Sequence, residues 1–214
     1  MKINKIAIIG LGYVGAPLMH SLLINKFNCV GFDRSQMRIK QLQEGFDVTK
    51  EIDKSKVSLF KYKISNNPII LKDCDIFIAT VPTPITKNKL PNISFVKNAT
   101  KIAAKYMSKN STFILESTVY PGLTEEICLP IIEKITKLKC NYNKDKGGFH
   151  IGYSPERINP GDKDHRIDNT VKIISASSSY ALNKIKYIYS KVTKNNLHIS
   201  PSIKVAEAAK IIEN

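Results

Sequence analysis

Apolar residues along the chain gather into short continuous runs, which are separated by stretches of helical spacing. Runs of strand length stand at residues 5–9, 28–32, 75–79, 112–116, 148–153, 171–175 and 197–199. Helical spacing is found at residues 13–25, 34–45, 94–109, 124–137, 177–191 and from residue 200 or 201 onward. The polar, Lys-rich stretch 46–72 predicts a helix near 53–61 and a strand near 62–65. This alternation predicts an α/β fold, a doubly wound parallel sheet of six or more strands with helices on both faces.

Three helical segments have apolar positions that predict how each helix packs. In segment 34–45 they are Met37, Ile39 and Leu42. In segment 94–109, Ser94 is the expected N-cap and the inner face consists of Phe95, Ala99, Ile102, Ala103 and Tyr106. The last helix carries an apolar stripe of Val205, Ala208, Ala209 and Ile212, which predicts an exposed helix that binds a partner.

Three glycines follow the first apolar run at the spacing G-x-G-x-x-G and open a helical segment. Gly10 lets the chain turn tightly, Gly12 lets the backbone approach a pyrophosphate, and Gly15 lets the helix pack closely on the strand. With Tyr13 and Val14 in the turn, the helix start directs its N–H groups and positive dipole end at the phosphates. The motif predicts a Rossmann-like dinucleotide site.

Asp33 ends the second apolar run, about 20 residues after the glycines, where a dinucleotide fold places the acid that binds the adenosine ribose. A carboxylate there accepts from two hydroxyls and repels a 2′-phosphate, which favours NAD over NADP. The alternative is a turn Asp that follows a strand. Arg38 lies one helical turn further on, where it either reaches Asp33 or the adenosine, or is an ordinary surface arginine.

Two later strand ends carry further candidate contacts, because ligands of open parallel sheets lie beyond the carboxyl ends of the strands. Two prolines that follow the run 75–79 fix a rigid, extended loop. Thr83 lies between these prolines and offers its hydroxyl and backbone to a cofactor. A plain rigid loop is the alternative. The candidate cofactor contacts at these two ends are Val81, Pro82, Thr83, Pro84, Ser117 and Thr118.

Composition limits what else the chain does. Its 214 residues include 29 Lys and 4 Arg, and the net charge is +15. We interpret the lysines as a solvated surface that also concentrates anionic nucleotides, and expect no nucleic-acid partner because no Arg cluster or aromatic-rich basic stripe is present. No apolar run is long enough to span a bilayer. The four cysteines lack C-x-x-C spacing and predict reduced thiols in a cytoplasmic protein, and His150 and His165 lack metal-ligand spacing, so we expect no metal site.

Five motifs stand in order along the chain: GLGYVG at 10–15, VPTP at 81–84, ESTVYPG at 116–122, YSPERINPG at 153–161 and KVAEAAKIIEN at 204–214. With them the chain resembles the nucleotide-sugar 6-dehydrogenases of the UDP-glucose/GDP-mannose dehydrogenase type. The R-x-N-P-G that follows Glu156 is similar to the branch that oxidises UDP-N-acetylglucosamine or its galactosamine epimer. The resemblance implies a UDP-sugar substrate and a role in making precursors of bacterial surface polysaccharide.

The resemblance also implies roles for individual residues. The family oxidises a C6 alcohol to a carboxylate in two hydride transfers to NAD, through an aldehyde and a cysteine thioester. Thr118 is then expected near the nicotinamide and a bound water, and Glu156 is the expected base. Lys210 and Asn214, four residues apart on one helix face, are expected to hold the developing oxyanion. The implied substrate contacts are Glu156, Arg157, Ile158, Asn159, Lys210 and Asn214. On local sequence alone, Glu156 with Arg157 and Lys210 with Glu213 are instead ordinary surface charge pairs.

The family pattern divides the chain into an NAD-binding domain, residues 1–199, and the beginning of a central dimerisation helix, residues 200–214. The family's nucleophilic cysteine belongs to a later domain and has no counterpart among Cys29, Cys74, Cys128 and Cys140. We therefore expect this chain alone not to complete the oxidation. Two alternatives remain: a non-catalytic NAD-binding remnant or half of a split enzyme, and a dehydrogenase of the hydroxyacid or 6-phosphogluconate type.

Overall fold

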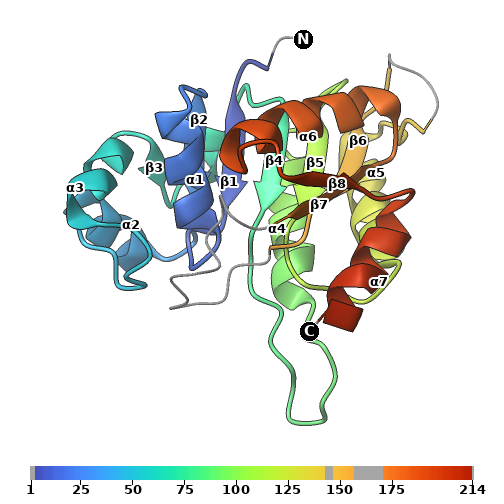
Figure 1. The fold of residues 1–214 in the computed structure, drawn as a ribbon, viewed down its shortest axis with the longest axis horizontal. Helices are drawn as coiled ribbons and strands as arrows, with labels where there is room; N and C mark the ends of the chain where they lie inside the picture. Colours follow the sequence, from blue (N-terminus) through green and yellow to red (C-terminus); the bar gives the residue numbers. More distant parts are fainter. Residues whose placement is uncertain (1–2, 143–146, 157–170, 214) are drawn as a thin grey trace.

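The computed structural model describes residues 3–142, 147–156 and 171–213, and Figure 1 shows its arrangement. The strands are β1 (Ile6–Ile9), β2 (Cys29–Phe32), β3 (Ile64–Ser65), β4 (Ile76–Ala79), β5 (Thr112–Leu115), β6 (His150–Tyr153), β7 (Lys172–Ala176) and β8 (Leu197–Ile199). The helices are α1 (Gly15–Ile24), α2 (Gln36–Gln43), α3 (Lys54–Val57), α4 (Ser94–Ala104), α5 (Leu129–Thr136), α6 (Ser179–Val192) and α7 (Ile203–Glu213). Short turns of helix complete the list: η1 (Ser58–Phe60), η2 (Pro68–Leu71) and η3 (Thr124–Cys128).

The eight strands found in the described residues form one sheet in the order β3-β2-β1-β4-β5-β6-β7-β8. Strands β1 to β6 are parallel, as the sequence predicts. Strand β7 runs antiparallel to β6, with Tyr153 opposite Ser175, and β8 runs parallel to β7. The last two strands therefore run opposite to the first six, a reversal that the pattern of apolar runs did not predict.

Both faces of the sheet are buried, which explains the continuous apolar runs of its strands. On one face Ile6 and Ile8 of β1 belong to a core that includes residues of α1 and α6. On the other face Ala7 and Ile9 belong to a core that includes residues of α4, α5 and α7. The prediction of a doubly wound sheet with helices on both faces is confirmed (Figure 1).

Two local expectations are wrong. Met37 is 71% exposed, while Ile39 and Leu42 of the same helix are buried as predicted. Helix α4 begins at Ser94, and its N-cap is Ile93, which provides no side-chain cap, so Ser94 is the first helical residue and not the cap. The side chain of Asn92, one residue before the cap, accepts from the Ser94 N–H at 3.0 Å.

The direction of the strands gives the sheet two functionally different edges. We call the edge where β1 to β6 end the carboxyl edge, and the edge where they begin the amino edge. Because β7 is reversed, its first residue, Lys172, lies at the carboxyl edge, next to the residues that follow β6.

Candidate functional site

The glycine turn after β1 is packed against the end of β4. Gly10 has a φ of +99°, and a Cβ on it would lie 2.9 Å from the Thr80 carbonyl oxygen. A Cβ on Gly15 would lie 1.8 Å from the Gly10 carbonyl oxygen, to which the Thr80 hydroxyl also donates at 2.7 Å. A side chain at either glycine would therefore push the turn away from the sheet.

Gly12 is in a different situation, because a Cβ on it would meet no atom within 4 Å. It lines a cavity of about 250 Å³ at the carboxyl edge, together with Gly10 and Asp33. Helix α1 starts directly behind this turn, and Val14 at its N-cap provides no side-chain cap. The first N–H groups of α1 and its positive dipole end thus face a cradle that a side chain would fill, which fits a pyrophosphate.

Asp33 lies at the same cavity, held by backbone groups on both sides. Its Oδ2 accepts from the Leu11 N–H and its Oδ1 from the Ser35 N–H, both at 2.8 Å. Each carboxylate oxygen keeps a second lone pair, so the fixed carboxylate has room to accept from ribose hydroxyls. Phe95, with the Arg34 guanidinium 4.9 Å from its ring centre, forms part of the wall. The described residues therefore fit a dinucleotide with free ribose hydroxyls.

Arg38 contacts the turn from behind. Its side chain is buried, its Nε donates to the Leu11 carbonyl at 2.7 Å, and its Nη2 lies 2.7 Å from Oδ1 of Asp47. The alternative that Arg38 is an ordinary surface arginine is thus wrong. Its side chain supports the glycine turn through Leu11 and Asp47, and the expected contact to Asp33 is replaced by these two.

The loops that follow β4 and β5 are tied to each other. The Ser117 hydroxyl donates to the Val81 carbonyl at 2.6 Å, and the Thr83 hydroxyl donates to the Thr118 carbonyl at 2.7 Å. Val81 and Pro82 line the cofactor cavity, and the half-buried Thr118 follows the neighbouring strand. The hydroxyl of Thr83 therefore fixes the two loops relative to each other, and Pro84 is exposed where the next loop begins.

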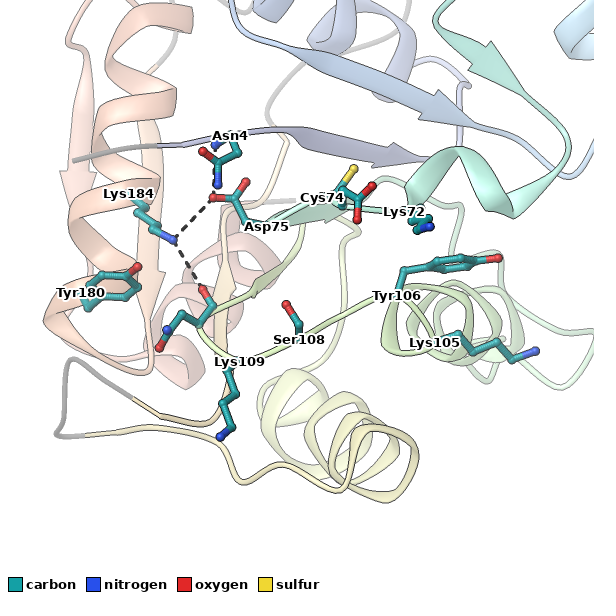
Figure 2. A pocket seen from close by; sticks show the side chains of 12 residues that line it. Asn4, Lys72, Cys74, Asp75, Lys105, Tyr106, Ser108, Lys109, Tyr180 and Lys184 are labelled. Carbon is teal, nitrogen blue, oxygen red and sulfur yellow. Dashed lines mark hydrogen bonds and ion pairs between the residues drawn. The ribbon is translucent and has the colours of Figure 1, made fainter.

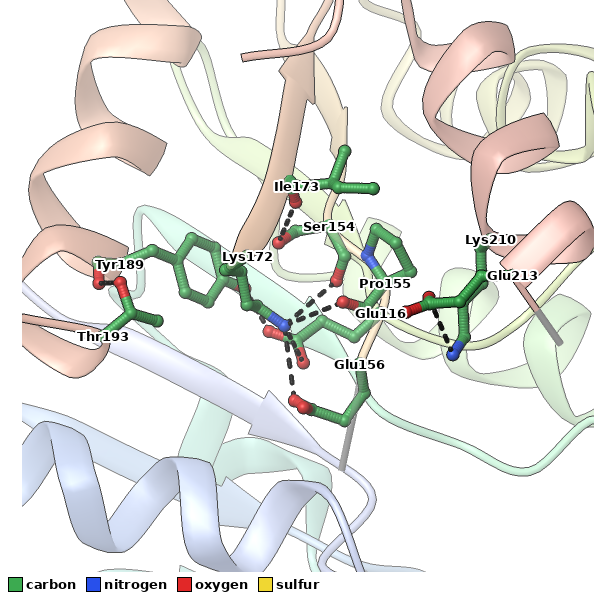
Figure 3. A network of polar contacts seen from close by, with 10 residues as sticks. All are labelled: Glu116, Ser154, Pro155, Glu156, Lys172, Ile173, Tyr189, Thr193, Lys210 and Glu213. Atoms are coloured by element: carbon green, nitrogen blue, oxygen red, sulfur yellow. Dashed lines mark hydrogen bonds and ion pairs between the residues drawn. The ribbon is translucent and has the colours of Figure 1, made fainter. Parts of the chain in front are cut away.

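Four residues from separate segments form what we call the buried charge network: Glu116, Glu156, Lys172 and Tyr189. The Lys172 Nζ lies 3.2 Å from Oε2 of Glu116 and 3.3 Å from Oε2 of Glu156. It also donates to the carbonyls of Ser154 and Pro155, at 3.3 and 3.2 Å. The Tyr189 hydroxyl donates to Oε1 of Glu116. Figure 3 shows the Lys172 ammonium between the two carboxylates.

Burial decides the protonation of this network. It raises the pKa of Glu116 to about 7, because the lowering effects of Lys172 and Tyr189 offset the loss of water only in part, and the charge of Glu156 raises it further. Burial lowers the pKa of Lys172, but the two carboxylates outweigh it and keep that pKa above its ordinary value. The pKa of Tyr189 is raised by burial and by the charge of Glu116. Burial thus moves the pKa of Glu116 toward neutral pH.

Glu116, Lys172 and Tyr189 are the residues that the sequence analysis missed as site residues. Glu116 lay within a recognised motif but had no assigned role. Lys172 had one visible signal, since it is a charged residue at the start of an otherwise apolar strand. A parallel β7 would have placed it at the amino edge, and only the reversal of β7 places it beside Glu156.

Helix α7 is attached to the carboxyl edge through a buried acid. Glu207 accepts from the Gly122 N–H, and its Oε1 accepts from the N–H and the hydroxyl of Thr124 at 2.9 and 2.6 Å. Lys210, one turn later, is largely buried, and its Nζ lies 3.6 Å from Oε2 of Glu213. The expected partner Asn214 and the expected substrate contacts Arg157, Ile158 and Asn159 lie outside the described residues.

The four cysteines are free thiols, and three of them are buried. Burial raises the pKa of Cys74 and Cys128 to about 12 and that of Cys140 to about 11, and it raises the pKa of Cys29 well above its ordinary value. Because the thiolate is the reactive form, none of the four is set up as a nucleophile.

Within residues 3–142, 147–156 and 171–213, no group of three or more His, Cys, Asp or Glu side chains is placed to hold a metal ion. In the same part of the chain, no helix has the length and apolar character needed to cross a membrane.

A larger cavity, of about 530 Å³, lies at the amino edge (Figure 2). Four lysines and two aspartates line it: Lys72, Lys105, Lys109, Lys184, Asp73 and Asp75. Lys184 is buried there, with its Nζ 3.9 Å from Oδ2 of Asp75 and 3.5 Å from the Asn110 carbonyl. None of the catalytic, cofactor-binding or substrate-binding residues proposed from the sequence lines this cavity.

Comparison with known proteins identifies the family. The model of the UDP-glucose/GDP-mannose dehydrogenase family, NAD binding domain, matches residues 4–193. The chain is 43% identical to the UDP-N-acetyl-D-glucosamine 6-dehydrogenase of Pseudomonas aeruginosa, over 100% of this chain and 50% of that protein. It is 41% identical to the Salmonella typhi protein of the same name, over 98% and 48%.

A solved structure gives the same result. The UDP-D-ManNAc dehydrogenase of Pyrococcus horikoshii matches with a TM-score of 0.86 at 29% identity, covering 98% of this chain and 49% of that one. The chain spans about half the length of the relatives it matches. It belongs to the UDP-glucose/GDP-mannose dehydrogenase family, and residues 4–193 form the NAD-binding domain of that family.

Proposed function

We propose that this chain is the cofactor-binding part of an NAD-dependent dehydrogenase that oxidises the C6 hydroxyl of a UDP-N-acetylhexosamine to the uronic acid. One observation carries the proposal: the cradle at Gly12 and the carboxylate of Glu156 both lie at the carboxyl edge of one sheet. The names of the Pseudomonas aeruginosa and Salmonella typhi relatives and the R-x-N-P-G after Glu156 support the choice of substrate.

The chemistry divides between the cofactor and this chain. NAD, when bound, supplies the hydride acceptor for the substrate carbon. The Gly12 turn and the start of α1 bind its pyrophosphate, Asp33 accepts from its ribose hydroxyls, and the linked loops at Thr83 and Thr118 orient the reacting end. Glu156 is the base that takes a proton from the bound water or from the thiohemiacetal, and Lys210 with Asn214 binds the oxygen on which negative charge develops.

The step that needs a thiolate is assigned to a cysteine outside this chain. The raised pKa values of Cys74, Cys128 and Cys140 support this assignment. In the same proposal, residues 1–199 are the cofactor domain and residues 200–214 begin a helix that forms a homodimer. The exposed side chains of Val205 and Ile212 on that helix support a partner there. Cytoplasmic free thiols, no nucleic-acid partner, and a product that feeds bacterial surface polysaccharide complete the proposal.

The test is NADH formation by the protein as its source makes it, with UDP-N-acetylglucosamine, UDP-N-acetylgalactosamine, UDP-glucose and 6-phosphogluconate as parallel substrates. We expect turnover of a UDP-N-acetylhexosamine, and a loss of turnover in Glu156→Gln with NAD still bound. Oxidation of 6-phosphogluconate alone would favour the hydroxyacid-type alternative. NAD binding without turnover of any substrate would favour the non-catalytic remnant or a half-enzyme.

A further inference from the structure

Glu207 is a fully buried acid of α7, and it accepts hydrogen bonds from residues 83 and 85 positions earlier in the chain. Its Oε2 accepts from the Gly122 N–H, and its Oε1 accepts from the N–H and the hydroxyl of Thr124 at 2.9 and 2.6 Å. A buried carboxylate is costly unless its oxygens are hydrogen-bonded, and bonds to a carboxylate are stronger than those between neutral groups. These bonds therefore join α7 firmly to the start of η3.

The loop between β5 and η3 is held at both ends. Near its start the Thr83 hydroxyl donates to the Thr118 carbonyl at 2.7 Å, and near its end Glu207 binds the Gly122 N–H. Gly122 has a φ of +97°, which favours glycine, and a Cβ on it would lie 2.5 Å from Oε1 of Glu126. The backbone of this turn is closely fitted, so a shift at Glu207 would move the loop that carries Thr118.

Lys210 lies on the same buried face of α7, three residues after Glu207. Residues three apart on a helix are neighbours on its surface, and Ile203 and Ala206 of this face pack into the core that includes residues of α4 and α5. Apolar contacts hold the helix on the sheet but are not directional. The position of the helix along and about its axis is therefore fixed by directional bonds, and Glu207 supplies such bonds one turn before Lys210.

We propose that Glu207 is a positioning residue, whose carboxylate sets Lys210 of α7 and Thr118 of the loop after β5 at a fixed distance from each other. The inference rests on the proposed function, in which the loop at Thr118 orients the reacting end of the cofactor and Lys210 binds the developing oxyanion. A donor stabilises that oxyanion only when it stands where the charge develops. The reaction therefore needs α7 and the loop to keep their places relative to each other.

Two substitutions weaken the link, and a third serves as the control. Glu207→Gln keeps the size of the side chain but turns an NH₂ group toward the donors of Gly122 or Thr124, which breaks at least one hydrogen bond. Thr124→Val is close in shape, removes only the hydroxyl bond, and serves if Glu207→Gln does not fold. The matched control is Lys204→Met, because Lys204 joins the same two elements at the surface, with its Nζ 3.5 Å from Oε1 of Glu126 and both side chains 61% exposed.

The first readout needs no substrate. Amide shifts and hydrogen exchange of the ¹⁵N-labelled 214-residue chain report on both sides of the link. Because a hydrogen bond to a charged group is lost, we expect Glu207→Gln to speed exchange of the Gly122 N–H by about tenfold or more and to shift the amides of Thr118 and Lys210. Lys204→Met is expected to leave them nearly unchanged. Changes confined to the turn at Gly122, or equal changes in Lys204→Met, would overturn the inference.

The second readout is turnover of the UDP-N-acetylhexosamine by the protein as its source makes it. Misplacing a reacting group by about 1 Å costs up to about 100-fold in rate, so we expect Glu207→Gln to lower kcat by about 10- to 100-fold, with KM for NAD nearly unchanged. Thr124→Val is expected to have a smaller effect. The double variant is expected to lose less than the product of the two factors, because both substitutions break the same link.

Two results of the turnover experiment have different meanings. Full kcat in a stably folded Glu207→Gln variant, or factors that multiply in the double variant, would overturn the inference, because α7 and the loop would then keep their places without the carboxylate. A wild-type protein that turns over no substrate would instead refute the proposed function. In that case the amide map decides whether Glu207 sets Thr118 and Lys210 relative to each other.

Discussion

The cavity at the carboxyl edge has less than half the volume of the one at the amino edge, about 250 against about 530 Å³. The smaller one is bounded by glycine backbone, the fixed carboxylate of Asp33 and the ring of Phe95. The larger one is bounded mainly by lysine and aspartate side chains. A nucleotide needs free N–H groups, a carboxylate for the ribose and an apolar wall, and only the smaller cavity combines them. Chemistry of the lining, and not size, thus identifies the site.

Two buried lysines, Lys172 at the carboxyl edge and Lys184 at the amino edge, also differ in their contacts. Lys172 at the carboxyl edge is within 3.3 Å of two carboxylates and two carbonyls. Lys184 at the amino edge has contacts of 3.5 and 3.9 Å, with the Tyr180 ring centre at 4.5 Å. The short contacts make Lys172 the centre of the buried charge network, whereas Lys184 has only long contacts and lines the cavity at the amino edge.

The largest loss of NAD affinity is expected from a side chain at Gly12, which would occupy the space of the ligand in the smaller cavity. Gly12→Glu places a side chain and a negative charge in the cradle without a steric clash, since a Cβ there meets nothing within 4 Å. We expect NAD affinity to fall by about 3 kcal/mol or more, the scale of like-charge contact in a binding site, with little change in stability. Calorimetric titration measures it. The control is Lys109→Glu, which puts a negative charge at the amino edge. A comparable loss of NAD affinity in this variant would contradict the assignment of the cofactor to the smaller cavity.

The second effect concerns the dependence of stability on pH. The pKa of Glu116 is raised from an ordinary 4.5 to about 7, so the folded state binds the extra proton, and this contribution to stability is lost as pH rises through 7. The loss between pH 4.5 and 7 is on the order of 3 kcal/mol. Urea unfolding of Glu116→Gln should show a flatter profile over this window. A profile as steep as that of the wild type would show that Glu116 does not cause the pH dependence of stability.

Asp33→Asn tests the ribose contact and is expected to have an intermediate effect. The amide still accepts from a backbone N–H but loses the charge that strengthens hydrogen bonds to ribose hydroxyls. We expect NAD affinity to fall by about 1 to 3 kcal/mol, the scale of hydrogen bonds to charged groups. Fluorescence or calorimetric titration measures it, and an unchanged affinity would take Asp33 out of the site.

Lys184→Met is expected to have the smallest effect. The ammonium removed has only long contacts, and the carboxylate of Asp75 still accepts from the Lys5 and Asn4 N–H groups at 3.0 and 3.3 Å. We expect the free energy of unfolding to change by about 1 kcal/mol, the scale of one ordinary hydrogen bond, with NAD affinity unchanged. Weaker NAD binding in this variant would mean that the two edges are coupled.

The carboxyl edge has two parts, the glycine cradle and the buried charge network. The sequence predicts the cradle but not the network, because the two are built differently. The cradle comes from one continuous motif, so the spacing of Gly10, Gly12 and Gly15 and the position of Asp33 are visible in the sequence. The buried charge network joins four segments that are 16 to 73 residues apart. Its assembly depends on the reversal of β7, which the apolar pattern of that strand does not reveal, because a strand buried on both faces reads the same in either direction.

Arg38 illustrates the same limit on a smaller scale. Its position after Asp33 indicated the correct neighbourhood. Its ion pair with Asp47 depends on the path of a polar stretch whose pattern is weak, and the sequence did not predict that this stretch returns to the glycine turn. The start of α4 shows another limit: Ser is a favoured cap residue, but the sequence does not show at which residue the backbone becomes helical, and Ser94 is already inside the helix.

The most direct test of the central claim is a map of backbone amide shifts on addition of NAD to the ¹⁵N-labelled chain. The account predicts that the shifts concentrate at the carboxyl edge, on Gly10, Gly12, Asp33 and Val81, and leave Lys72, Lys109 and Asn110 unaffected. Shifts concentrated on the lysine-lined cavity at the amino edge would contradict it.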